Sequence, residues 1–150
     1  MAQTLVSLLI HIVFSTKHRQ DLITPEIEPQ LYAYLGGIAR QYQSRLLSAG
    51  GTANHVHLLV SQSKNIALSD VLEELKKSSS KWIKTQGAEF GRFHWQDGYG
   101  AFSIGASQIP AVTAYLARQK QHHQKKSFQE EFIELLEKYG IEYAEKYLWD

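Results

Sequence analysis

The order of strand-like and helix-like segments is the feature that most limits what this chain can fold into. Alternation and short runs of apolar side chains predict strands over residues 5–16, 45–49, 55–61 and 101–106. Amphipathic stretches predict helices over 24–43 and 69–85. This βαββαβ order is typical of an α+β, ferredoxin-like split βαβ sandwich. We therefore expect an antiparallel sheet with helices on one face and additional C-terminal helices.

Turn and capping residues predict where several elements begin and end. Gly50-Gly51 predicts a hairpin-like connection between the second and third strands. A helix is expected over 109–123 after the fourth strand. Ser127 and Glu130 have the spacing of a capping box for the final helix, which Gly140 can end.

The composition of the chain limits its domain organisation and its chemistry. With 150 residues, of which 43% are hydrophobic, the chain can bury one core, so we expect a single domain over residues 1–150. The absence of cysteine excludes disulfides, zinc–thiolate sites and cysteine nucleophiles. It also fits a reducing cytoplasm, which is the expected location. Any metal must therefore use nitrogen and oxygen ligands.

The apolar segment 5–14 is expected to be a buried strand rather than a signal peptide. No Lys or Arg precedes it, and His11 interrupts it. No apolar run approaches the roughly 20 residues needed to cross a bilayer, so we expect no membrane partner.

Basic residues cluster locally, although the net charge of the chain is only +1. Lysines recur on one face of the predicted helix over 69–85, and other basic residues follow the first strand and the predicted helix over 109–123. Such residues most often form an ordinary solvated surface, but they can also contact DNA phosphates. The candidate DNA contacts are Lys17, Arg19, Lys77, Lys81, Lys84 and Arg118.

Two histidines flank Val56 in the predicted third strand. Alternate residues of a strand face the same side of a sheet, so His55 and His57 should project together. A neutral imidazole offers one nitrogen lone pair to a metal, and two imidazoles could share one ion. Alternating histidines also occur on ordinary exposed strand faces, so the spacing alone leaves both interpretations open. We interpret His11, within the first strand, as structural.

Tyr115 and Gln119 are four residues apart, which places them one turn apart on the predicted helix. A phenol there could act as a nucleophile beside an amide oxygen that binds a metal. A packed aromatic side chain and a solvated glutamine are the ordinary interpretations of the same residues. His122 and His123 could lie on the same side or form a polar helix end, and neither is assigned to the metal.

Taken together, these residues resemble the single-tyrosine HUH transposases of the insertion sequence 200-like family (IS200/IS605 type). The resemblance covers nearly the whole chain. A His-Val-His element alone is a weak signal, but the order and spacing of all the blocks make the combined match specific. The blocks are Phe14-Ser15-Thr16-Lys17-His18-Arg19, Asn54-His55-Val56-His57-Leu58-Leu59, residues 76–82, Trp95-Gln96-Asp97-Gly98-Tyr99-Gly100-Ala101-Phe102-Ser103 and Tyr115-Leu116-Ala117-Arg118-Gln119, followed by His122-His123.

The resemblance implies a metal-dependent DNA transposase. His55, His57 and Gln119 would hold Mg2+ or Mn2+, and Tyr115 would attack single-stranded DNA to form a 5′-phosphotyrosine intermediate. The implied substrate is the end of a mobile element that contains a hairpin. A homodimer is implied as well, with the site assembled either within one chain or between two.

Two other functions stay open at this point. A domesticated relative that processes repeated hairpins, or an HUH nickase, would use the same chemistry on other DNA. A noncatalytic module that binds single-stranded nucleic acid would present aromatic side chains to bases. That last interpretation leaves Tyr115 and Gln119 without a role.

Overall fold

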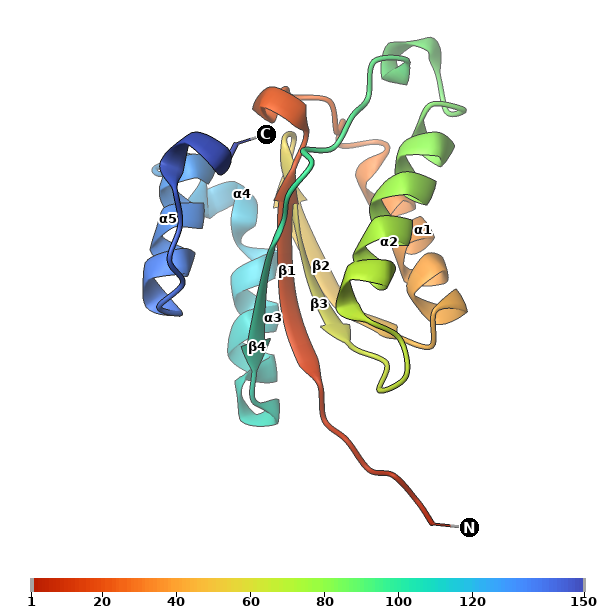
Figure 1. The fold of residues 1–150 in the computed structure, drawn as a ribbon. Helices are drawn as coiled ribbons and strands as arrows, with labels where there is room; N and C mark the ends of the chain where they lie inside the picture. Colours follow the sequence, from red (N-terminus) through yellow and green to blue (C-terminus); the bar gives the residue numbers. More distant parts are fainter. Residues whose placement is uncertain (1, 150) are drawn as a thin grey trace.

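The computed structural model describes residues 2–149, and at its centre four strands form one antiparallel sheet (Figure 1). The strands pair in the order β2-β3-β1-β4. This order confirms the expected α+β, ferredoxin-like arrangement. The elements of the split βαβ core are β1 (Leu9–Ser15), α1 (Glu28–Gln41), β2 (Arg45–Thr52), β3 (His55–Ser61), α2 (Leu68–Ile83) and β4 (Gly100–Ile104).

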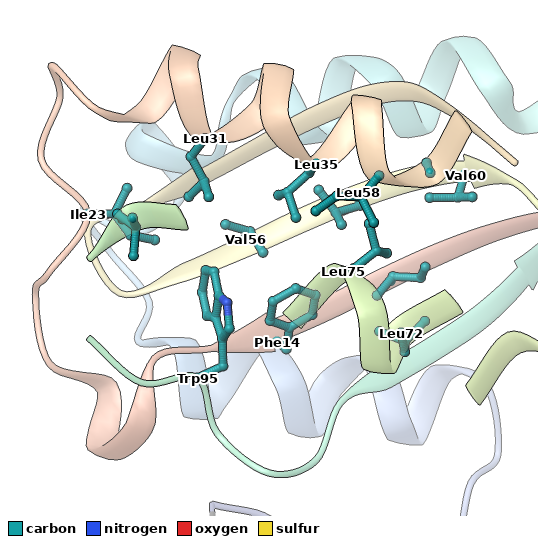
Figure 2. Close-up of a cluster of buried hydrophobic side chains, with 14 of the residues drawn as sticks. Phe14, Ile23, Leu31, Leu35, Val56, Leu58, Val60, Leu72, Leu75 and Trp95 are labelled. Carbon is teal, nitrogen blue, oxygen red and sulfur yellow. The ribbon is translucent and has the colours of Figure 1, made fainter. Parts of the chain in front are cut away.

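One face of the sheet packs against α1 and α2. Alternation along β1 and β3 directs Phe14, Val56 and Leu58 to this side, where all three are fully buried. Figure 2 shows leucines of the two helices lying over these strand residues, with Trp95 close to Phe14. Burial of a large apolar side chain stabilises a fold by about 1.5–3 kcal/mol, so this cluster is the main core of the molecule.

The C-terminal helices α3 (Ile109–Ala117), α4 (Gln119–His122) and α5 (Phe128–Lys138) lie on the opposite side of the sheet, at the left of Figure 1. Leu116 of α3 packs with Leu59 of β3. Phe132 of α5 packs with Val13 of β1. The space between this sheet face and the three helices is where the candidate site forms.

The final helix begins and ends as predicted. The Ser127 hydroxyl accepts a hydrogen bond from the Glu130 backbone N–H, and the Glu130 carboxylate accepts one from the Ser127 backbone N–H, which completes a capping box. Gly140, with a φ of +66°, adopts the left-handed conformation that commonly follows a helix end.

Several element ends differ from the predictions. The first strand starts at Leu9 rather than residue 5, because its partner β3 ends at Ser61, directly opposite Leu9. Leu5 is 83% exposed as a result. α1 begins at Glu28 rather than residue 24. The predicted helix over 109–123 is interrupted at Arg118, whose φ of −101° and ψ of 14° separate α3 from α4.

The predicted turn at Gly50-Gly51 is wrong, because both glycines lie inside β2. Gly50 is paired with His57, and the turn falls at residues 53–54 instead. A Cβ at Gly50 would lie 2.0 Å from the carbonyl oxygen of Leu116. The glycine is needed for the close approach of α3 to β2, and this approach carries the neighbouring Tyr115 to the sheet.

No helix among residues 2–149 combines the length and apolar character required of a membrane span.

Candidate active site and metal centre

His55 and His57 are both fully buried, on the sheet face that the C-terminal helices cover. Behind His55, the Nδ1 atom lies 2.8 Å from Asn54 Oδ1. Behind His57, the Nδ1 atom lies 2.8 Å from His11 Nε2. Both imidazoles therefore direct Nε2 toward α4 and α5. His11 supports this orientation from β1, in agreement with its structural interpretation.

Tyr115 and Gln119 meet the two histidines within a single chain. Gln119 is 1% exposed, and its Oε1 lies 3.1 Å from His55 Nε2. The rings of Tyr115 and His57 are 5.7 Å apart between centroids, in an edge-to-face arrangement. The structure thus brings together the four residues that the sequence predicts for catalysis and metal binding.

Glu131 of α5 lies at the centre of this cluster and was not predicted. Its Oε1 is 2.9 Å from His57 Nε2 and 3.0 Å from His123 Nε2. Its Oε2 accepts hydrogen bonds from Gln119 Nε2, at 2.9 Å, and from the hydroxyl of Tyr115. Glu131 is only 1% exposed.

One sequence signal could have identified this residue. Glu131 follows Phe128 by three residues and precedes Leu135 by four, so it falls in the apolar stripe of the final helix. A carboxylate is rarely buried without a partner, and its position there indicates a charged or hydrogen-bonded counterpart.

His123 also joins the cluster, whereas the sequence left it unassigned. Its side chain is 9% exposed, and its ring lies 4.4 Å from that of His55 between centroids. His122 lies further out, with its Nε2 3.4 Å from Glu131 Oε2 and 29% of its side chain exposed.

Burial and neighbouring charges shift the ionisation of these groups. Burial, together with the proximity of His57, lowers the pKa of His55 to about 3. Burial and the negative charge of Glu131 raise the pKa of Tyr115 above its ordinary value of 10.0. Burial raises the pKa of Glu131, but its contacts with His123, His57 and Tyr115 outweigh burial and lower it well below its usual range. At neutral pH the phenol is therefore protonated, and its attack would need a proton acceptor and nearby positive charge.

The donor atoms of the cluster fit a divalent metal ion. Ligand atoms of His55, His57, His123 and Glu131 all lie within 4.8 Å of one another. Imidazole nitrogen and carboxylate oxygen are common metal ligands, and Gln119 Oε1 borders the same space. A bound cation would also offset the buried negative charge of Glu131.

A cleft of about 320 Å³ opens beside Tyr115, between α3 and α5. Glu131, His122 and Lys138 are among the residues that line it, and Lys138 carries a positive charge. Tyr115 therefore borders an open cleft, while His55 and His57 are closed off from solvent.

The predicted DNA-contacting residues do not form one surface around this cleft. Lys77 and Lys81 are exposed on α2 and Lys84 is exposed directly after it, across the sheet from α3, which carries Tyr115 (Figure 1). Arg118 is exposed next to α3, on the same side as the site.

The other two predicted DNA contacts, Lys17 and Arg19, lie shortly after β1 and are not fully exposed. The Arg19 guanidinium donates a hydrogen bond of 2.7 Å to the Trp149 carbonyl and lies over the Trp149 ring. Lys17 is half-buried.

Comparisons with known proteins agree with the fold. The family model described as "Transposase IS200 like" matches residues 4–119. No curated protein matches the sequence.

Two solved structures share the fold. One is a protein of Deinococcus radiodurans R1 assigned as a transposase, with a TM-score of 0.62 and 20% identity, over 77% of this chain and 92% of that one. The other is a REP-associated tyrosine transposase bound to a REP hairpin, with a TM-score of 0.56 and 11% identity, over 77% of this chain and 68% of that one.

Proposed function

Because this chain belongs to the IS200-like transposase family, we propose that it cleaves and rejoins single-stranded DNA at hairpin-containing ends of a mobile element. One observation carries the proposal. The hydroxyl of Tyr115 lies in the same buried cluster as His55, His57 and Gln119, beside a cleft that admits a ligand. A noncatalytic binding module would not need this convergence.

Tyr115 is the proposed nucleophile. Its oxygen attacks the scissile phosphorus, the bond from phosphorus to the 3′ oxygen breaks, and the DNA stays attached to the enzyme through a 5′-phosphotyrosine. Glu131 Oε2 accepts the hydrogen bond of the Tyr115 hydroxyl and orients its oxygen, and the phenolic proton passes to water in the cleft. The leaving 3′ oxygen takes a proton from water. A second 3′-hydroxyl can then reverse the step, so cleavage and joining need no ATP.

His55, His57 and Gln119 would hold the divalent metal, Mg2+ or Mn2+. Such an ion supplies positive charge to the phosphate and stabilises the transition state. The residues that would hold the ion lie beside Tyr115, so the charge of the ion would act next to the nucleophile. His11 and Asn54 fix the two imidazole rings from behind, and Gln119 Nε2 donates to the same carboxylate that accepts from Tyr115.

We expect the active form to be a homodimer in which each chain keeps its own site. Tyr115 and Gln119 already lie at the histidines of the same chain, so a partner is not needed to complete the cluster. The second chain would instead bring a second DNA end within reach.

Processing of dispersed hairpins is a second candidate function. It is favoured by the likeness to the REP-associated tyrosine transposase, which was solved with a REP hairpin. The chemistry at Tyr115 would be unchanged. The two candidates differ in whether hairpins beside the gene or hairpins elsewhere in the chromosome are cleaved.

The proposal is tested with 3′-labelled single-stranded oligonucleotides that span the hairpins flanking the gene, incubated with the full chain and Mg2+ or Mn2+. The parent should form an adduct that survives denaturing electrophoresis and retains the 3′ label. Tyr115→Phe should form none. Tyr147→Phe, which changes a tyrosine that is 70% exposed, serves as the matched control. An equal amount of adduct from Tyr115→Phe would refute the nucleophile assignment.

A further inference from the structure

Glu131 and His123 lie beyond residue 119, where the match to the family model ends. Both nevertheless contact the two strand histidines directly. Glu131 Oε1 is within 2.9–3.6 Å of the Nε2 atoms of His57, His123 and His55. The C-terminal helices thus add two donor groups to the three that the family resemblance implies.

The hydrogen bonds made by the Nδ1 atoms of His123 and His55, which point away from Glu131, indicate which ring nitrogen carries the proton of a neutral imidazole. His123 Nδ1 lies 2.6 Å from the carbonyl oxygen of Lys126, and a carbonyl can only accept. A neutral imidazole at this position carries its proton on Nδ1, which leaves the lone pair of Nε2 facing Glu131. His55 has the same arrangement, because its Nδ1 donates to Asn54 Oδ1.

Acceptor atoms consequently face one another at the centre of the cluster. The lone pair of His123 Nε2 points at Glu131 Oε1 over 3.0 Å. The lone pair of His55 Nε2 points at Gln119 Oε1 over 3.1 Å. His57 adds a third lone pair if His11 Nε2 accepts the proton of its Nδ1 over 2.8 Å. A cation is the partner that such converging lone pairs would bind in a buried space.

We propose that His123 and Glu131 are metal ligands in addition to His55, His57 and Gln119, so that a single chain surrounds the ion with three imidazoles, one carboxylate and one amide oxygen. The inference deepens the proposed function and rests on its use of a divalent metal. Three imidazoles and one carboxylate favour Mn2+, Co2+ or Zn2+ over Mg2+, which prefers oxygen ligands. Glu131 Oε1 faces the metal, and its Oε2 holds the hydroxyl of Tyr115. One carboxylate therefore connects the metal to the nucleophile.

The first test measures metal binding alone, without DNA. The metal-free full chain is titrated with Co2+ and followed by visible absorption and by competition with a chelator. Loss of a residue that only orients a ligand lowers metal affinity about 10- to 100-fold, so Glu131→Gln and His123→Gln should each lower Co2+ affinity at least about tenfold. Millimolar Mg2+ should not displace Co2+ from the parent.

Two matched variants control for general effects of the substitutions. Glu134→Gln changes an exposed carboxylate one turn further along α5, and His94→Gln changes an exposed histidine. Both should bind Co2+ as the parent does.

The second test counts ligands in the parent and does not depend on the folding of any variant. X-ray absorption of the Co2+-loaded parent chain should show three imidazoles. Two imidazoles in the parent would overturn the proposal. So would parent-like Co2+ affinity of Glu131→Gln and His123→Gln together with loss of binding in His55→Ala. Those results would leave the covalent adduct of Tyr115 untouched, so the two proposals can fail separately.

Discussion

Replacement of Gly50 by alanine should weaken both the fold and the active site. A Cβ at this position would lie 2.0 Å from the carbonyl oxygen of Leu116 and 2.7 Å from its carbonyl carbon. Packed carbon and oxygen atoms stay more than about 3 Å apart, so α3 and β2 must separate by about 1 Å or more. Because β2 is hydrogen-bonded to β3 along its length, we expect α3 to move.

The expected size of the effect follows from this displacement. Overpacking of this kind costs about 1–3 kcal/mol. At roughly 2–4 °C per kcal/mol for a chain of this size, the melting temperature should fall by about 2–12 °C. Leu116 is next to Tyr115, and a misplacement of about 1 Å can lower a catalytic rate about 100-fold. The assays are thermal unfolding by circular dichroism and the initial rate of covalent adduct formation.

Gly36→Ala is the matched control for this experiment. A Cβ at Gly36, within α1, would make an ordinary contact of 3.7 Å with Leu46 Cδ2. This substitution should raise stability by about 0.5–1 kcal/mol, because alanine favours a helix interior over glycine, and it should leave adduct formation unchanged. A Gly50→Ala variant that melts at the parent temperature and reacts at the parent rate would refute the reasoning.

Two further predictions concern the face of the sheet away from the site. Ser79→Ala removes the buried hydroxyl that accepts a 2.9 Å hydrogen bond from the Trp95 indole N–H. It should lower the free energy of unfolding by about 1–3 kcal/mol. Denaturant unfolding followed by tryptophan fluorescence measures this loss, and an unchanged midpoint would contradict the prediction. Burial lowers the pKa of Lys76 from 10.5 to about 8, partly offset by the charge of Asp97. Between these values the unfolded chain binds more protons than the native chain, so this group makes the free energy of unfolding rise with pH. Lys76→Met should therefore show a smaller rise than the parent between pH 8 and pH 10.5 in denaturant titrations, and identical pH profiles would argue against the shift.

Much of the fold follows from local patterns that the sequence displays directly. Strand alternation in 55–61 predicts both the third strand and the shared direction of His55 and His57, and the structure confirms both. The capping box at Ser127 likewise needs only residues three positions apart. Such features depend on contacts between near neighbours, so composition and spacing are sufficient to find them.

The misplaced turn at Gly50-Gly51 has a long-range cause. Glycine pairs often mark hairpin turns, and here the same lack of a side chain instead admits the backbone of α3. The signal in the sequence is identical in the two cases. Only the position of Leu116, 66 residues later along the chain, distinguishes them.

The sequence by itself determined the order of the elements, the two histidines on one strand face and the helical spacing of Tyr115 and Gln119. These depend on the periods of strands and helices, which act over a few residues. The tertiary structure decided that α5 folds back over the sheet and places Glu131 among the imidazoles. That placement depends on Phe128 and Phe132 packing against β1 and β4, which is a contact between distant parts of the chain that no local pattern encodes.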